Sequence, residues 1–197
     1  MTAVAMENIN YKEDNRSKTS KPLLWIGIVS IIMFFSGLTS AVVVSQGGGG
    51  FINIELPFAF TISTIIIIVS SVAFHFGLMA IKNGNLSMAK ICISSTLILG
   101  LLFVFSQFLG WINLYQQGIY AVGSQSTQQS SYLYLLTSLH VAHLVGGLIS
   151  LLVVLVKTVK EKYSPTNFLG VQVSLTYWHF LGGLWIYLFL FLKFVIV

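Results

Sequence analysis

Five long apolar runs constrain the fold of this chain more than any other feature of its sequence. They span residues 23–45, 56–81, 89–114, 132–158 and 168–197. A helix needs about 20 apolar residues to cross the hydrocarbon core of a bilayer, and every run is long enough. Backbone groups left without partners in lipid are costly, so the runs must form helices. The sequence therefore predicts an all-α integral membrane bundle of five transmembrane helices.

The composition leaves little for any other kind of domain. Hydrophobic residues make up 56% of the chain and charged residues 8%, whereas soluble domains are roughly 25% charged. We expect one membrane domain at residues 22–197, preceded by a polar, disordered cytoplasmic tail at residues 1–21. Turn-forming residues lie between the runs, namely four glycines at 47–50, Asn-Gly-Asn at 83–85 and Pro165. Because Cys92 is the only cysteine, no internal disulfide is possible.

The basic residues fall almost entirely on one side of the predicted membrane. Only Lys193 lies on the side of the C-terminus. The other nine Lys and Arg residues are Lys12, Arg16, Lys18, Lys21, Lys82, Lys90, Lys157, Lys160 and Lys162. By the positive-inside rule, this asymmetry places the N-terminus inside and the C-terminus outside. It also accounts for the net charge of +5, so we expect no nucleic-acid partner.

Acidic side chains are absent from the interior of every predicted span. The five carboxylates lie in the tail, in loops or at helix ends, at Glu7, Glu13, Asp14, Glu55 and Glu161. Proton pumps carry charge through buried Asp, Glu or His, so this chain alone makes a poor pump. No acid is placed to orient a histidine against a Ser or Thr nucleophile, which argues against hydrolase chemistry. We therefore expect no catalytic residue in this chain.

All four histidines, by contrast, lie inside spans. Polar and glycine residues form a stripe along one face of each of the last four helices, at about 100° per residue. The stripes are Thr64, Ser71 and His75; Thr96, Gly100, Phe103, Gln107 and Gly110; Thr137, His140, His143 and Gly147; and Gln172, Thr176, His179 and Gly183. The helices can meet through these faces.

The residues alone leave three uses for the histidines open. The first is interhelical contact, in which small residues allow close approach and polar side chains bond across the interface. The second is a metal or haem site in a haem-binding membrane anchor or a quinol-oxidising subunit using His140, His143 and His179, because neutral imidazole ligates iron, copper and zinc. The third is a transport pathway. His140 and His143 are adjacent on one helix, which fits a stacked pair of haems badly.

The four tryptophans divide by position. Trp25 and Trp111 lie near span ends, where tryptophan anchors a helix at the membrane surface. Trp178 and Trp185 lie on the face of the last helix opposite His179. We expect these two indoles to face lipid or a partner subunit.

Five short motifs follow one another through the spans. They are MFFSGLTSA at 33–41; Leu56-Pro57 with Ser63-Thr64, Ser70-Ser71 and His75; LGLLFVFSQFLGW at 99–111; Thr137, His140, His143 and Gly147; and YWHF at 177–180 followed by Trp185. In this order they resemble subunit III of the haem-copper oxidases, the cytochrome c and quinol oxidases.

The sequence departs from the family pattern at three positions. Ile31 stands where the family has an acidic residue, so the buried carboxyl to which a proton-related role is often assigned is absent. Gly182 replaces the Asp that follows YWHF, and Ser138 replaces the Gly after Thr137. The longer members carry two further helices before the matched region. This chain resembles the five-helix form, and the lipid-filled cleft of the longer members does not carry over to it.

The resemblance implies a non-catalytic accessory subunit. In such oxidases haem and copper belong to subunits I and II, whereas subunit III packs directly on subunit I, binds membrane lipids and supports complex stability and sustained proton uptake. We therefore expect no metal or cofactor in this chain. We expect contacts between helices, or with lipid or another subunit, at His75, Gln107, Thr137, His140, His143, Gly147, Tyr177, Trp178, His179 and Trp185.

Two further expectations follow from the resemblance. A short five-helix chain favours the bacterial plasma membrane over the mitochondrial one. The alternative within the family is the accessory subunit of a nitric-oxide reductase, which resembles subunit III.

Overall fold

Five long helices make up the described part of the chain, as predicted. The computed structural model describes residues 3–46, 55–123 and 126–196, with side chains from residue 19 to 195 of these ranges. The helices are α1 Ala3–Gln46, α2 Phe58–Lys82, α3 Leu86–Gln116, α4 Gln128–Val159 and α5 Leu169–Phe191, and a short π-helix, η1 Leu192–Ile196, continues α5. Each helix is long and apolar enough to cross a membrane. The predicted glycine joint at 47–50 lies outside the described residues.

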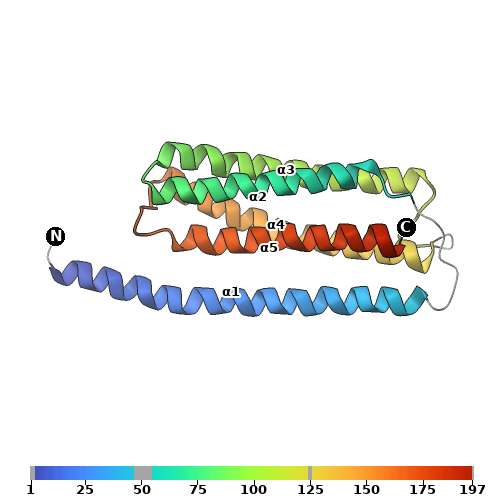
Figure 1. Cartoon of the computed structure of the whole chain (residues 1–197), viewed down its shortest axis with the longest axis horizontal. Helices are drawn as coiled ribbons and strands as arrows, with labels where there is room; N and C mark the ends of the chain where they lie inside the picture. Colours follow the sequence, from blue (N-terminus) through green and yellow to red (C-terminus); the bar gives the residue numbers. More distant parts are fainter. Residues whose placement is uncertain (1–2, 47–54, 124–125, 197) are drawn as a thin grey trace.

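Helices α2 to α5 pack in a closed ring, and α1 lies along the outside of that ring against α5 and α4 (Figure 1). Helix α1 buries Ile28, Phe35 and Val42, which are spaced seven residues apart and therefore share one face. On the same side, the Thr39 and Tyr187 hydroxyls lie 3.0 Å apart. The four-helix ring thus forms the core, and α1 joins it through one narrow face.

The start of α1 lies in the polar segment that precedes the first apolar run. The helix begins at Ala3 and continues through Pro22. Extending an existing helix adds one hydrogen bond per residue ordered, so the apolar span supplies the nucleus that this polar segment lacks by itself. The apolar, membrane-length part of α1 is Thr19–Gln46.

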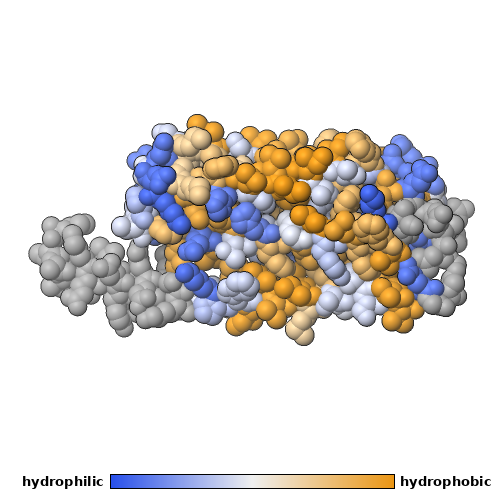
Figure 2. Space-filling view, viewed as in Figure 1, coloured by the Kyte–Doolittle hydropathy of each residue, from blue (hydrophilic) through white to orange (hydrophobic). Residues whose placement is uncertain are grey.

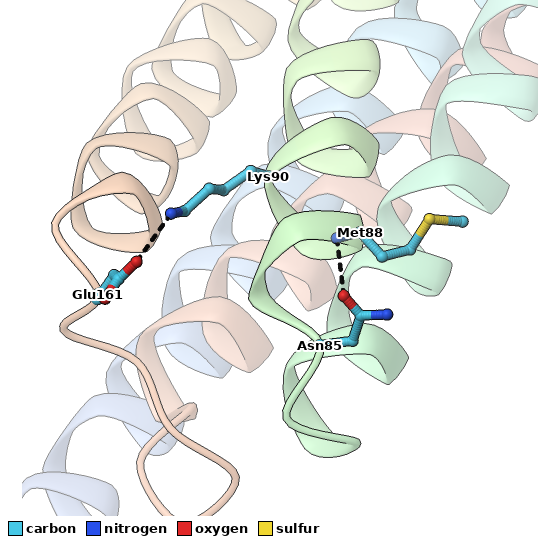
Figure 3. A network of polar contacts seen from close by, with 4 residues as sticks. All are labelled: Asn85, Met88, Lys90 and Glu161. Atoms are coloured by element: carbon cyan, nitrogen blue, oxygen red, sulfur yellow. Dashed lines mark hydrogen bonds and ion pairs between the residues drawn. The ribbon is translucent and has the colours of Figure 1, made fainter.

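The turn between α2 and α3 forms where the sequence predicts it. Gly84 has φ of 74°, a left-handed conformation that glycine adopts without steric cost. Asn85 then caps α3, because its side-chain oxygen accepts a hydrogen bond from the Met88 backbone N–H at 3.1 Å (Figure 3). The turn makes α2 and α3 antiparallel neighbours.

The surface of the bundle is that of a membrane protein. Large apolar side chains such as Ile65, Leu101 and Ile149 are exposed. Figure 2 shows a broad apolar band across the bundle, with hydrophilic residues gathered most strongly at its two ends. The two chain termini lie at opposite ends of the bundle (Figure 1).

Candidate functional site

Two tryptophans of α5 fill the core of the four-helix ring. Trp178 is 1% exposed and Trp185 is 0% exposed. The Trp178 Nε1–H donates to the Ser70 hydroxyl at 3.2 Å, and the Trp185 Nε1–H donates to the Thr64 hydroxyl at 3.0 Å. The expectation that these indoles face lipid or a partner subunit is therefore wrong. Instead, both bind α5 to α2.

Glycines on neighbouring helices make room for the first of these indoles. A Cβ atom placed on Gly100 of α3 would lie 2.7 Å from Cη2 of Trp178. On Gly147 of α4 it would lie 2.8 Å from Cδ1 of Leu181 and 3.3 Å from Cε3 of Trp178. The Trp178 side chain thus lies between α2, α3 and α4, at positions where only a missing side chain leaves enough space.

The spacing of residues along α5 carries a signal for this buried face. Ser174, Trp178, Leu181, Trp185 and Leu188 recur every three or four residues, and all five are buried. The polar residues of the predicted α5 stripe lie outside this buried face. Gln172 and Thr176 are half-buried, and His179 is exposed. Both faces of α5 are apolar enough for lipid, so polarity does not mark its inward face, which carries the two tryptophans.

The predicted stripe on α3 does face the core. Thr96, Gly100, Phe103, Gln107 and Gly110 are all buried. Gln107 donates from Nε2 to the Ser63 hydroxyl of α2 at 2.8 Å. The contact role expected for Gln107 is thus seen in the structure as a hydrogen bond between two buried side chains.

His140 is enclosed in the same core. It is 0% exposed, and its ring centroid lies 5.2 Å from that of Trp185 and 5.9 Å from that of Phe103. Within the described part of the chain, neither ring nitrogen has a hydrogen-bond partner, and the same holds for Gln107 Oε1. His140 therefore occupies its place through ring packing and not through a bond to a neighbouring helix.

This environment predicts the effect of an apolar replacement. His140→Leu removes a buried polar ring without breaking a protein hydrogen bond, so the unfolding free energy in mixed micelles should stay the same or rise by up to about 1 kcal/mol. Gln107→Leu is the matched control in the same core. It breaks the bond to Ser63 and should lower the unfolding free energy by about 0.6 kcal/mol. A loss of stability in His140→Leu as large as that in Gln107→Leu would contradict the absence of a hydrogen bond to the imidazole.

Thr137 lies one turn before His140 and links α4 to α3. Its hydroxyl donates to the Leu133 carbonyl at 2.9 Å and accepts from the Trp111 Nε1–H at 3.0 Å. Trp111, which we expected to be a surface anchor, therefore binds a buried threonine of the next helix.

His143 lies on a different side of α4 from the core. Its Nδ1 is 2.7 Å from the Leu139 carbonyl oxygen of its own helix. Its ring packs edge-on against Phe35 of α1, with the two ring centroids 5.5 Å apart. The Tyr177 hydroxyl donates to the His143 backbone carbonyl at 3.3 Å. His143 and Tyr177 thus lie where α4, α5 and α1 meet.

The remaining two histidines line an open groove. His75 of α2 and His179 of α5 are both exposed, and their ring centroids are 6.1 Å apart. The groove between these helices has a volume of about 420 Å³ and is otherwise mainly apolar, with Gly182 and Gly183 on its α5 side. The four histidines are therefore not one cluster, since two line the groove, one lies in the core and one faces α1.

The side chains that could bind a metal do not come together at one place. Among the residues whose side chains are described, from 19 to 195 with gaps at 47–54 and 124–125, no three His, Cys, Asp or Glu side chains lie close enough together to hold a metal ion. The arrangement that the structure does show is one of helix packing, with aromatic rings inserted between helices and polar side chains hydrogen-bonded from one helix to the next.

Comparison with known proteins agrees with the motifs. The chain matches the family model described as cytochrome c oxidase subunit III over residues 20–196. It is 31% identical over 172 residues to the cytochrome c oxidase subunit 3 of Corynebacterium diphtheriae, an alignment that covers 83% of this chain and 82% of that protein. It is 30% identical to the probable cytochrome c oxidase subunit 3 of Mycobacterium tuberculosis, with 88% and 85% covered.

Similarity extends to a quinol oxidase. The chain is 30% identical over 181 residues to the cytochrome bo(3) ubiquinol oxidase subunit 3 of Buchnera aphidicola, covering 87% of this chain and 90% of that protein. Apart from Thr19, the matched residues include the membrane-length part of every α-helix. The chain therefore belongs to the cytochrome c oxidase subunit III family.

Proposed function

We propose that this chain is a non-catalytic accessory subunit of a terminal oxidase in a bacterial plasma membrane. It packs directly on subunit I, with subunit II in the same complex, and the haem and copper lie in those partners. Its work is to stabilise the complex and to sustain proton uptake and oxygen reduction in aerobic respiration. Membership of the subunit III family is the observation that carries the proposal.

The placement of the histidines supports this role over that of a haem-binding anchor. Iron could reach His140 only if the Trp185 and Phe103 rings moved, because the imidazole has no exposed surface. The Nδ1 atom of His143 is already bonded to its own helix. His75 and His179 are accessible, but the groove between them is otherwise mainly apolar and is lined by no acidic residue.

The described spans also contain no acidic residue that could relay protons by itself. Ile31, at the position of the family's acidic residue, is partly buried against the core. An isoleucine cannot exchange protons, so support of proton uptake by this chain must act through the structure of its partner. The basic residues favour an N-terminus in the cytoplasm and a C-terminus outside.

Copurification tests the proposal. An affinity tag on the full chain should recover a large oxidase subunit with haem and copper in the complex. After dissociation, this chain alone should show no haem absorption band and no stoichiometric iron or copper. A haem that stays with the isolated chain, or recovery without any oxidase subunit, would refute the accessory role. In spheroplasts, added protease should remove a C-terminal tag and spare an N-terminal one.

A further inference from the structure

Three lysines gather around one depression at the inner end of α4. Lys157, Lys160 and Lys162 line it together with the apolar side chains of Leu152, Val153 and Val156. Its volume is about 320 Å³. Charge therefore lies at one end of the depression and exposed aliphatic surface at the other.

The backbone of the helix end brings these lysines together. Glu161 has φ of 54°, and the N–H groups of Glu161 and Lys162 donate to the carbonyls of Thr158 and Lys157 at 3.1 and 3.0 Å. This is the Schellman pattern of helix termination, which usually has glycine at the left-handed position. It turns the chain back, so that Lys162 returns to the level of Lys157.

The neighbouring charges do not cancel those of the three lysines. The Glu161 carboxylate pairs with Lys90 of α3 at 3.1 Å (Figure 3). The Lys82 ammonium lies over the Phe168 ring, 5.2 Å from its centroid. Lys82 and Lys90 are thus engaged within the bundle, whereas Lys157, Lys160 and Lys162 form no ion pair with any residue whose side chain is described.

We propose that this depression binds one anionic phospholipid, with its phosphate among the three lysines and one acyl chain along Leu152, Val153 and Val156. The charged and apolar residues follow one another as the headgroup and acyl chain of a lipid do. Leu152 lies five residues before Lys157, which is about 7.5 Å farther from the helix end at 1.5 Å per residue. Basic pockets at the inner ends of transmembrane helices favour anionic headgroups. The site lies away from the histidine groove; it rests on the membrane orientation proposed above, which puts this end of α4 in the cytoplasmic leaflet, but not on the accessory role in an oxidase.

Lipid retention by the full chain tests the site. The chain is reconstituted in nanodiscs with equal amounts of phosphatidylglycerol and phosphatidylcholine, released into mild detergent and analysed by native mass spectrometry. Phosphatidylglycerol should be retained over phosphatidylcholine by roughly tenfold. Joint replacement of the three lysines by glutamine should bring that ratio close to unity, and joint replacement by arginine should preserve it. An unchanged ratio in the glutamine variant would overturn the proposal.

Two further variants separate a lipid site from diffuse charge. Val153→Trp keeps every charge but fills the apolar end, so it should lower retention of phosphatidylglycerol, whereas Lys193→Gln at the opposite end should not. Wild-type retention in Val153→Trp would show that charge alone acts and would overturn the site. Soluble glycerol phosphate should not displace the lipid, and displacement would identify a free-phosphate site instead. If the triple variant does not fold, Lys160→Gln alone should give an intermediate ratio.

Discussion

Replacing Trp178 with alanine should lower the unfolding free energy of the isolated chain by about 3 kcal/mol. The indole is 1% exposed, it packs at Gly100 and Gly147, and it donates a hydrogen bond to Ser70, so one side chain joins α5 to three other helices. Helix association in lipid depends on packing, because the tails are as apolar as the side chains. The loss therefore comes from the cavity and from the lost indole hydrogen bond to Ser70, whose hydroxyl still donates to the Thr96 carbonyl. Equilibrium unfolding in mixed micelles, followed by tryptophan fluorescence and circular dichroism, measures it.

Trp25→Ala provides the matched control for this prediction. Trp25 is 59% exposed on α1, so the same change of side chain should alter stability by no more than about 0.5 kcal/mol. Equal effects of the two substitutions would contradict the inward placement of Trp178. The expectation drawn from the sequence alone, that Trp178 faces lipid or a partner, predicts that equality.

Replacing Gly100 with alanine should destabilise the chain by about 2 kcal/mol, although alanine is the better helix former. The added Cβ would lie 2.7 Å from Cη2 of Trp178 and 2.8 Å from Cδ2 of Leu148. The leucine can rotate, but the rigid indole is held by its bond to Ser70. The helices must therefore separate locally. Equilibrium unfolding in mixed micelles should measure the resulting decrease in unfolding free energy.

A second substitution should rescue the first. Trp178→Phe removes the indole atoms that the new methyl group would meet, so Gly100→Ala should be nearly neutral in that background. The two changes should show a coupling energy of at least about 1 kcal/mol in a double-mutant cycle. Gly37→Ala on α1 is the control, because its Cβ would meet no atom within 4 Å. Additive effects of Gly100→Ala and Trp178→Phe would show that the two residues do not touch.

Some packing could be predicted from residue type and spacing. On α3 the glycines, Gln107 and Phe103 lie on one face, and that face is buried because small residues allow close approach and a buried amide finds a hydroxyl partner. The same reasoning grouped Thr137, His140, His143 and Gly147, of which Thr137, His140 and Gly147 are buried inside the bundle, whereas His143 packs against α1. It did not show that His140 packs between rings without a bond, because that depends on Phe103 and Trp185 from two other helices.

The sequence by itself determined the number and approximate bounds of the membrane-length spans, and the family, because each depends on length, hydropathy and order along the chain. Only the tertiary structure decided which way α5 faces. In water the apolar face of a helix must point inward, but in a membrane both faces can be apolar, and hydropathy does not distinguish lipid from core. Trp178 and Trp185 point inward because Gly100, Gly147 and the hydroxyls of Ser70 and Thr64 provide the space and the bonding partners. Those residues come together only when the helices pack.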